Sequence, residues 1–250
     1  MANKLYDSSY LEKMQTFFRR TKERSYELLS PCDDDFIIDV GCGTGSDVCR
    51  IAQSGATVVG VDHDPMYIQI ATSQNHPENA SFICCEAAQM PFKDNSASKI
   101  RFDRVFQHIQ NHDETLAAAH RVLKDGGQLQ IIDSDYLSWA LFLEDWKLEQ
   151  KILHSLAYQR IPHAHQIRRL PRRLVECGFK IEFIEVHNYL VKDFDLANYI
   201  IKFDCIIEDE IKNKAISSSE RVAWEAHKRK PAPLFNISIN LLLIIARKCQ

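Results

Sequence analysis

The chain has 250 residues, of which 45% are hydrophobic and 26% charged, so it can bury one sizeable core or two small ones. We expect a single domain with insertions, as is common for α/β folds of this length. The net charge of −3 and a pI near 6.4 argue against the electrostatic footprint of a nucleic-acid-binding protein, which makes RNA a disfavoured partner.

Features that would direct the chain out of the cytoplasm are absent from the sequence. The stretch MANKLYDSSYLEKMQ lacks the apolar core of a signal peptide, and no apolar run reaches transmembrane length. The segment LFNISINLLLIIARK is too short and too polar to span a membrane and predicts a buried strand. The eight cysteines have no C-x-x-C spacing of a zinc site, so we expect reduced thiols in the cytoplasm.

The first half of the chain alternates strand-like and helix-like segments. A helical pattern over 8–29 precedes buried-strand patterns, and the helix of ETLAAAHRVL should be stopped by Gly126 and Gly127. This alternation is typical of a mostly parallel sheet with helices on both faces. The expected strands are 36–40, 57–62, 81–85, 98–102 and 128–133.

The second half is less regular, and we expect it to shape the substrate pocket. One strand is predicted at 180–186, and the last strand should follow Pro231 and Pro233. Gly178 is expected to cap the second of four helices. These helices are predicted at 139–158, 170–177, 195–213 and 219–228.

The stretch IIDVGCGTGSDVCRIA predicts a strand, a tight glycine turn and a helix. Gly41, Gly43 and Gly45 would let a ligand approach the main chain, close to the N–H groups of the following helix. Ser46 stands where a dinucleotide fingerprint has its third glycine, which weakens a pyrophosphate interpretation. Asp62, at the end of the second strand, could accept hydrogen bonds from both hydroxyls of a ribose. The alternative is a simple tight turn with Asp62 as a helix cap.

Further blocks favour the ligand-binding interpretation. In order and spacing they resemble the class I S-adenosylmethionine (SAM)-dependent methyltransferases, and within them the small-molecule type that includes quinone-biosynthesis methyltransferases. The resemblance covers about 36–135, with weaker similarity over 19–29 and 167–179. The blocks are DVGCGTG (39–45), VVGVDHDP (58–65), CEAAQMPF (85–92), DRVFQHI (103–109) and HRVLKDGGQLQIID (120–133).

The resemblance implies a Rossmann-like α/β fold. The sheet should have seven strands in the order 3-2-1-4-5-7-6, with the last strand antiparallel, helices on both faces and a helical cap. It further implies one methyltransferase domain, divided into an N-terminal helical lid (1–30), a SAM-binding core (31–135), a cap with the sixth-strand region (136–230) and the last strand (231–250).

The resemblance also places the cofactor, which is SAM before transfer and S-adenosylhomocysteine (SAH) after it. The methionine end would lie over Gly41, Cys42 and Gly43 in the turn that Gly45 completes, with Asp39 supporting the turn or the ammonium group. Around the adenine, the resemblance places His63 and Met66 beside the ring, Glu86 on the amino group and the backbone N–H of Ala87 on the ring. The remaining expected contacts are Asp62 on the ribose, Phe102 near the sulfonium, Gln107 on the cofactor and Arg20 on its carboxylate.

Two of these positions depart from the family pattern. Glu86 replaces the usual aspartate, and His63 replaces an aliphatic residue but can stack on adenine.

Methyl transfer is an in-line displacement that depends mainly on positioning and on exclusion of water. A general base helps when the acceptor is protonated, and the candidates are His108 and Asp135, with His112 and Asp133 beside them. The alternatives are a loop histidine bonded to backbone and an aspartate that caps a helix.

The variable half offers two further features. The basic cluster 168–173 could clamp an acidic group of the acceptor or be solvated surface. Its aromatic residues could line an apolar acceptor pocket or form core. They are Tyr136, Trp139, Phe142, Trp146, Tyr158, Tyr189, Tyr199, Phe203 and Trp224.

The sequence therefore predicts a SAM-dependent methyltransferase that acts on a small or medium organic acceptor, with no nucleic-acid partner. The alternatives are an RNA or protein methyltransferase, a non-catalytic SAM-binding module and, least favoured, a dehydrogenase. The methylated atom and the oligomeric state stay open.

Overall fold

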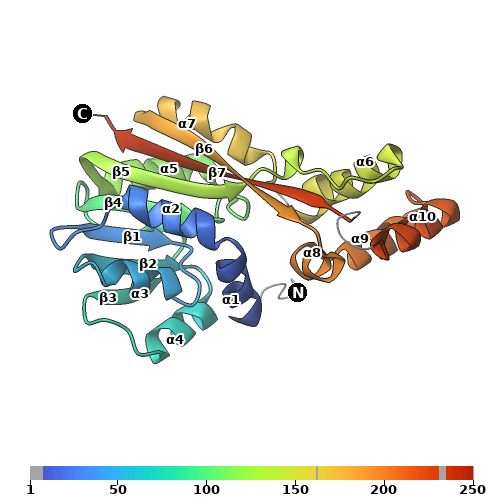
Figure 1. Ribbon diagram of the computed structural model, residues 1–250. Coiled ribbons are helices and arrows are strands. Elements are labelled where there is room, and N and C mark those ends of the chain that lie inside the picture. The colour runs from blue at the N-terminus through green and yellow to red at the C-terminus, as the bar shows by residue number, and fades with distance from the viewer. Residues whose placement is uncertain (1–7, 162, 231–234, 250) are drawn as a thin grey trace. The chain divides into compact units, whose positions relative to one another are not determined.

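A computed structural model of the chain describes residues 8–161, 163–230 and 235–249. Its seven-stranded sheet has the order β3-β2-β1-β4-β5-β7-β6, with β7 antiparallel to its neighbours, which confirms the predicted topology (Figure 1). The strands are β1 (Phe36–Val40), β2 (Thr57–Asp62), β3 (Ala80–Cys84), β4 (Ala97–Asp103), β5 (Leu123–Ser134), β6 (Phe179–Val191) and β7 (Ile237–Lys248).

The parallel half of the sheet is centred on β1, which pairs with β2 on one side and with β4 on the other. In this register Asp39 of β1 lies opposite Gly60 of β2 and opposite Arg101 of β4. Because parallel strands end at the same edge of a sheet, the carboxyl ends of β1 to β4 meet there. That edge is where open α/β sheets bind ligands.

The chain forms two compact units. The first unit runs to Asp133 and includes Arg169–Glu185 and the stretch from Leu243, whereas the second consists of Ser134–Arg168 and Val186–Leu242. Strand β5 ends at this boundary, and β6 and β7 each contribute to both units.

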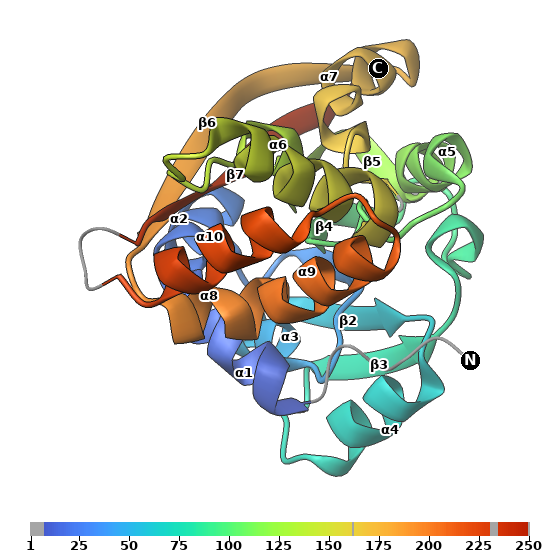
Figure 2. The same cartoon turned by 90° about the vertical axis from the view of Figure 1, so that its right-hand side faces the viewer.

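Helices cover both faces of the sheet in the first unit. Helices α2 and α3 lie on one face and α5 lies on the other (Figures 1 and 2). Leu29 of α2 and Val48 of α3 are fully buried against Ile37 of β1 and Val58 of β2. The helices of this unit are α1 (Ser8–Phe17), α2 (Arg19–Leu29), α3 (Ser46–Ala52), α4 (Pro65–Ser73), α5 (His112–Val122) and α7 (Leu170–Glu176).

The second unit is mostly helical, and its core is aromatic. Trp224 is fully buried, and its ring lies 5.8 Å from Phe194 and 5.5 Å from Phe203, measured between ring centroids. Ser217 and Glu220 form a capping box at the start of the last helix. The helices are α6 (Trp146–Ser155), α8 (Phe194–Ile201), α9 (Phe203–Lys212) and α10 (Ser218–Lys228), and the last three follow one another closely in space (Figure 2).

Strands β1 and β2 begin and end where they were predicted, but several helix predictions are wrong in extent. The helix expected over 8–29 breaks at Phe18, whose ψ of 17° leaves the helical range. The helix expected over 195–213 divides at Lys202, which adopts a left-handed φ of 63°. In both cases the helical spacing of apolar residues continues across the break, so the sequence pattern does not reveal it.

Two further predictions are corrected by local pairing. The helix expected from residue 139 starts only at Trp146, because Asp145 caps it and Ala140 instead forms an antiparallel bridge with Ser238. Helix α5 ends at Val122, and the strand expected from residue 128 already begins at Leu123, so Gly126 and Gly127 lie within β5.

Some predictions fall outside the described residues. These are the first seven residues of the expected lid, and Pro231 and Pro233 before the last strand. Among the helices within 8–161, 163–230 and 235–249, none is long and apolar enough to cross a membrane.

Candidate functional site

The glycine turn between β1 and α3 adopts backbone conformations that favour glycine. Gly41, Gly43 and Gly45 have φ values of 73°, 53° and 83°. A Cβ atom on Gly41 would lie 2.3 Å from Cγ2 of Val105, so no side chain fits there. The N–H groups of Gly41 and Cys42 both donate to the carbonyl of Val61, at 2.7 and 3.0 Å. The turn is therefore fixed to the end of β2.

Asp62 ends β2 beside this turn and is only 7% exposed. Its Oδ2 accepts a hydrogen bond from the N–H of Gly43, and its Oδ1 accepts one from the N–H of Asp64, both at 2.9 Å. A carboxylate oxygen can accept two hydrogen bonds, so both oxygens keep capacity for a further donor. Asp62 does not cap α4, because Asp64 does so through the N–H of Met66.

The residues expected around an adenine follow β2 and β3. The His63 side chain is 71% exposed, with Nδ1 3.4 Å from Oδ1 of Asp62. Met66 is half-buried in the first turn of α4. Glu86 is exposed and precedes the short 3₁₀ turn that begins at Ala87. The N–H of Cys85 donates to the carbonyl of Asp62 at 3.0 Å, which ties this segment to the end of β2.

Asp39, which precedes the turn, points into a buried ion pair. Its Oδ1 accepts a hydrogen bond of 2.8 Å from Nη1 of Arg101, whose side chain is fully buried. Burial raises the pKa of Asp39 to about 6 against the opposing charge of Arg101. Of the two roles expected for Asp39, this contact corresponds to support of the turn.

The same guanidinium belongs to a larger cluster that sequence reasoning missed. Arg101 also donates to Asp47 at 3.0 Å and to Asp103 at 2.8 Å. Burial opposes ionisation of Asp47, but the charges of Lys22 and Arg101 outweigh it and lower its pKa to about 2. The signal was available in part, because Arg101 lies on the predicted strand 98–102 and Asp103 directly follows it, so that alternation continued by one residue puts both on the same face.

Phe102 and Gln107 differ in whether their side chains could contact a cofactor. Phe102 has no exposed surface and packs against Phe106, with ring centroids 4.9 Å apart, so the predicted approach to a sulfonium has no support from this geometry. The N–H of Gln107 donates to Asp133 at 3.0 Å, and its Oε1 is buried without a partner among the described residues. Gln107 thus has unused hydrogen-bonding capacity, as Asp62 does.

The two histidines considered as bases differ in exposure. His112 is 3% exposed, and its Nε2 lies 2.9 Å from the carbonyl oxygen of Phe106, which is a structural contact. His108 is exposed, and its Nε2 lies 3.0 Å from Nε2 of Gln107. Asp133, which holds the N–H of Gln107, is itself 1% exposed.

Asp135, the other candidate base, lies in the second unit. Arg168 binds both of its carboxylate oxygens, Nε to Oδ1 at 2.7 Å and Nη2 to Oδ2 at 2.9 Å. A bidentate pair of this kind holds the carboxylate in one orientation. Asp135 is not the side-chain cap of the following turn.

The basic cluster 168–173 does not form one site. Arg168 pairs with Asp135 in the second unit, whereas in the first unit Arg173 pairs with Asp113 at 2.9 Å and Arg172 with Glu176 at 2.7 Å. The other expected carboxylate contact, Arg20, is exposed on α2.

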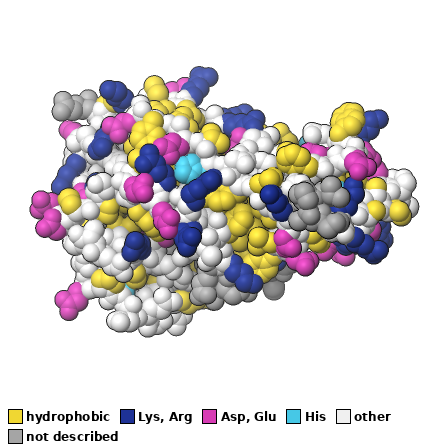
Figure 3. All heavy atoms as spheres, viewed as in Figure 1, with side chains coloured by type: hydrophobic (Ala, Val, Ile, Leu, Met, Phe, Trp, Pro, Cys, Tyr) yellow, Lys and Arg dark blue, Asp and Glu magenta, His cyan; other side chains and the backbone are white. Residues whose placement is uncertain are grey.

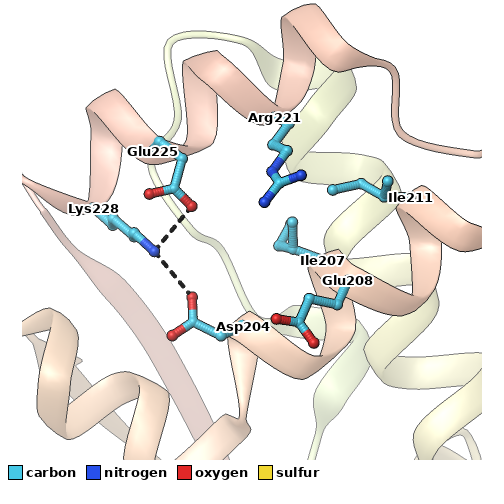
Figure 4. Close-up of a pocket in the computed structure, with 7 residues that line it drawn as sticks. All are labelled: Asp204, Ile207, Glu208, Ile211, Arg221, Glu225 and Lys228. Atoms are coloured by element: carbon cyan, nitrogen blue, oxygen red, sulfur yellow. Dashed lines mark hydrogen bonds and ion pairs between the residues drawn. The ribbon is translucent and has the colours of Figure 1, made fainter.

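The second unit has a shallow cavity of about 230 Å³ between α9 and α10 (Figure 4). Lys228 bridges Asp204 and Glu225 in it, at 3.3 and 3.0 Å. None of the aromatic residues expected around an acceptor lines this cavity. Several of those residues are fully or almost fully buried, including Trp139, Phe203 and Trp224, whereas Phe142, Trp146 and Tyr158 are more than half exposed.

Comparison with known proteins gives one family match and many structural matches. A methyltransferase-domain family matches residues 38–131. The chain is 23% identical to an uncharacterised 37.1 kDa protein in transposon TN4556 of Streptomyces fradiae, over 96% of this chain and 70% of that protein. It is 33% identical to a demethylmenaquinone methyltransferase of Tropheryma whipplei, over 39% of this chain and 41% of that enzyme, and so spans less than half of its length.

Among solved structures, a candidate methyltransferase from Bacillus halodurans C-125 has a similar fold. The TM-score is 0.65 at 17% identity, and the match covers 92% of this chain and 99% of that one.

Proposed function

Because the chain belongs to the class I SAM-dependent methyltransferases, with its methyltransferase domain at 38–131, we propose that it transfers a methyl group from SAM to a small or medium organic acceptor. The cofactor supplies a methyl group on a positively charged sulfur. The protein supplies a positioned acceptor and a site from which water is excluded.

The residues around the glycine turn fit such a cofactor. Asp62 carries the proposal, because it is a buried carboxylate with both oxygens still able to accept, as the two hydroxyls of a ribose require. Gly41 and Gly43 carry no side chains, so a ligand over the turn would meet main chain. His63, Met66, Glu86 and Ala87 would hold the adenine, and Gln107 would offer its unpaired Oε1 to the cofactor or the acceptor.

Two observations support a small acceptor. The demethylmenaquinone methyltransferase that this chain resembles over part of its length has a small organic substrate by name. On the face drawn in Figure 3, basic and acidic side chains are interspersed, whereas an RNA-binding surface would gather basic side chains. The net charge of −3 is in keeping with this pattern.

His108 is the candidate base that we place in the reaction, because it is exposed whereas His112 is buried against backbone. A general base contributes about 10² to 10⁴ in rate when the acceptor must lose a proton. His108→Asn should therefore lower kcat by that factor and leave SAH affinity unchanged. An unchanged kcat would show that His108 is not a general base and that positioning alone accounts for the rate.

The function is tested by methyl transfer from SAM labelled in its methyl group. The protein is incubated with a deproteinised metabolite extract, with total RNA and with denatured cell protein, and the label is followed into each fraction. We expect label in the small-molecule fraction only. Label in RNA or protein would overturn the acceptor class, and SAM binding without transfer to any fraction would indicate a non-catalytic binding module.

We also propose that the enzyme works in the cytoplasm, since all eight cysteines carry free thiols in the structure. Subcellular fractionation of growing cells of the native host, with the chain detected by an antibody, would test this location.

A further inference from the structure

Helix α2 buries charged and polar side chains where an ordinary surface helix buries apolar ones. Lys22 is 6% exposed and Ser25 is fully buried, and both lie on the face of α2 that packs on the sheet. Buried lysines are rare, because removal of an ammonium group from water is costly unless counter-charges replace the solvent. The Lys22 ammonium has two such partners, the carboxylates of Asp47 and Asp103.

One of these carboxylates follows the glycine turn, and the other ends the strand that pairs with β1. Asp47 lies in the first turn of α3, two residues after Gly45, and Asp103 is the last residue of β4. Lys22 Nζ donates to Oδ2 of Asp103 at 2.8 Å and to Oδ2 of Asp47. One ammonium therefore joins α2 to α3 and to the end of β4.

Tyr26 strengthens the same connection from the next turn of α2. Its hydroxyl donates to Oδ1 of Asp47 at 2.7 Å, so Lys22 and Tyr26 hold both oxygens of one carboxylate. Residues four apart on a helix share a face, which is why both can reach Asp47. Burial, together with the charge of Asp47, raises the pKa of Tyr26 above its ordinary range, so the hydroxyl keeps its proton as a donor.

The charges of the cluster balance. Asp39, Asp47 and Asp103 contribute three negative charges, and three buried or nearly buried cations oppose them. These cations are Lys22, Arg101 and Arg104. Removal of the Lys22 charge leaves the cluster with one excess negative charge directly beside the glycine turn.

We propose that Lys22 is a positioning residue for the cofactor: by fixing the start of α3 against the end of β4, it keeps Gly41, Gly43 and Gly45 in the conformation that receives the methionine end. The inference rests on the proposed placement of SAM over this turn. It differs from a general role in stability, because Asp47 comes two residues after Gly45 and Asp103 comes one residue after the β4 partner of Val40, the last residue before the turn.

Positioning and electrostatic attraction make opposite predictions for two ligands. SAM carries a net positive charge at neutral pH, whereas SAH lacks the sulfonium charge. An excess negative charge beside the turn would favour SAM over SAH, by Coulomb attraction. A disordered turn would weaken the binding of both ligands equally.

The experiment is calorimetric titration of the full chain with SAM and with SAH, for the wild type, Lys22→Met and Tyr26→Phe. The matched control is Arg24→Met, because Arg24 lies on the same helix and also forms two ion pairs, with Glu185 and Glu27, but has no contact with Asp47 or Asp103. Thermal unfolding of each variant is recorded alongside, to show that it is folded.

We expect Lys22→Met to raise the Kd of both ligands tenfold or more, Tyr26→Phe to raise both a few fold, and Arg24→Met to change neither by more than twofold. In Lys22→Met the pKa of Asp47 should rise, because its largest favourable charge is gone.

A folded Lys22→Met protein that binds both ligands as the wild type does would overturn the proposal, and so would tighter SAM binding with unchanged SAH. If Lys22→Met does not fold, Tyr26→Phe decides, since its ring remains in place, and wild-type affinity in that variant counts against the proposal. A wild type that binds neither ligand would instead reject the placement of SAM.

Discussion

Arg101 donates a hydrogen bond of 2.8 Å to Asp39, the residue that stands opposite it in the parallel register of β4 and β1. Both side chains are buried, so the acidic residue that precedes the glycine turn acts within the fold and not at its surface. The pair ties together the two strands whose ends flank the proposed cofactor site.

Asp62→Ala should abolish measurable binding of SAM and SAH, because it removes the carboxylate proposed to hold both ribose hydroxyls. Two charge-assisted hydrogen bonds of about 1.5 to 3 kcal/mol each correspond to a loss of at least a hundredfold in affinity. Calorimetric titration measures it. Asp64→Ala is the control, since Asp64 caps α4 and should lower stability by about 1 kcal/mol without changing affinity.

Gly41→Ala should lower both stability and cofactor affinity. The residue would have a φ of 73° and a Cβ atom 2.3 Å from Val105. We expect a loss of about 1 to 2 kcal/mol from the left-handed backbone and a further loss of about 1 to 3 kcal/mol from the clash. Chemical denaturation measures the sum.

Gly126→Ala separates these two contributions. Gly126 has nearly the same φ, 72°, but a Cβ atom there would meet nothing within 4 Å. It should therefore show only the backbone loss and bind SAH normally. Equal destabilisation of the two variants would contradict the role given to the contact with Val105.

Asp47→Asn should lower the free energy of unfolding at pH 7 by about 3 to 5 kcal/mol, because Lys22 and Arg101 each lose one of their buried counter-charges. In the folded wild type the pKa of Asp47 is about 2, below its ordinary value of 3.8. A lowered pKa stabilises the folded state above the unfolded value, and that contribution is lost as the pH falls through the folded value. For this shift the contribution is about 2.5 kcal/mol.

The difference in stability between Asp47→Asn and the wild type should therefore shrink as the pH is lowered from about 4 to 2. Asp39 has a raised pKa of about 6, so its contribution has the opposite sign and is lost as the pH rises through that value. The charge of Asp47 is one cause of the raised pKa of Asp39, so the comparison is made below pH 4, where Asp39 is protonated in the wild type. A difference that is constant with pH would contradict the assigned pKa.

Ser217→Ala should destabilise the start of α10 by about 1 kcal/mol, because the Ser217 side chain accepts from the N–H of Glu220 in a capping box. Amide hydrogen exchange in the first turn of α10 should become faster, with little change elsewhere. Ser218→Ala, one residue later and inside the helix, is the control. Exchange that rises to the same extent in both variants would show that the cap contributes nothing.

The elements that sequence reasoning placed well are those with short-range signals. Strands β1 and β2 were predicted to the residue, because each is a buried apolar run bounded by glycine or by a polar turn. The helices over 8–29 and 195–213 were predicted as single elements. The breaks at Phe18 and Lys202 depend on one residue's dihedral angles, which the spacing of apolar residues does not report.

The site residues likewise include some that the sequence predicts and some whose roles only the structure shows. The sequence by itself determined the glycine turn and the acidic residue at the end of β2, because backbone geometry permits those residue types there and the motif blocks stand in order along the chain. The tertiary structure alone decided the partners of Asp39, Asp47 and Asp103, since Lys22 and Arg101 come from distant segments. Whether a buried charge is paired depends on contacts across the fold, and such contacts leave no local pattern in a single sequence.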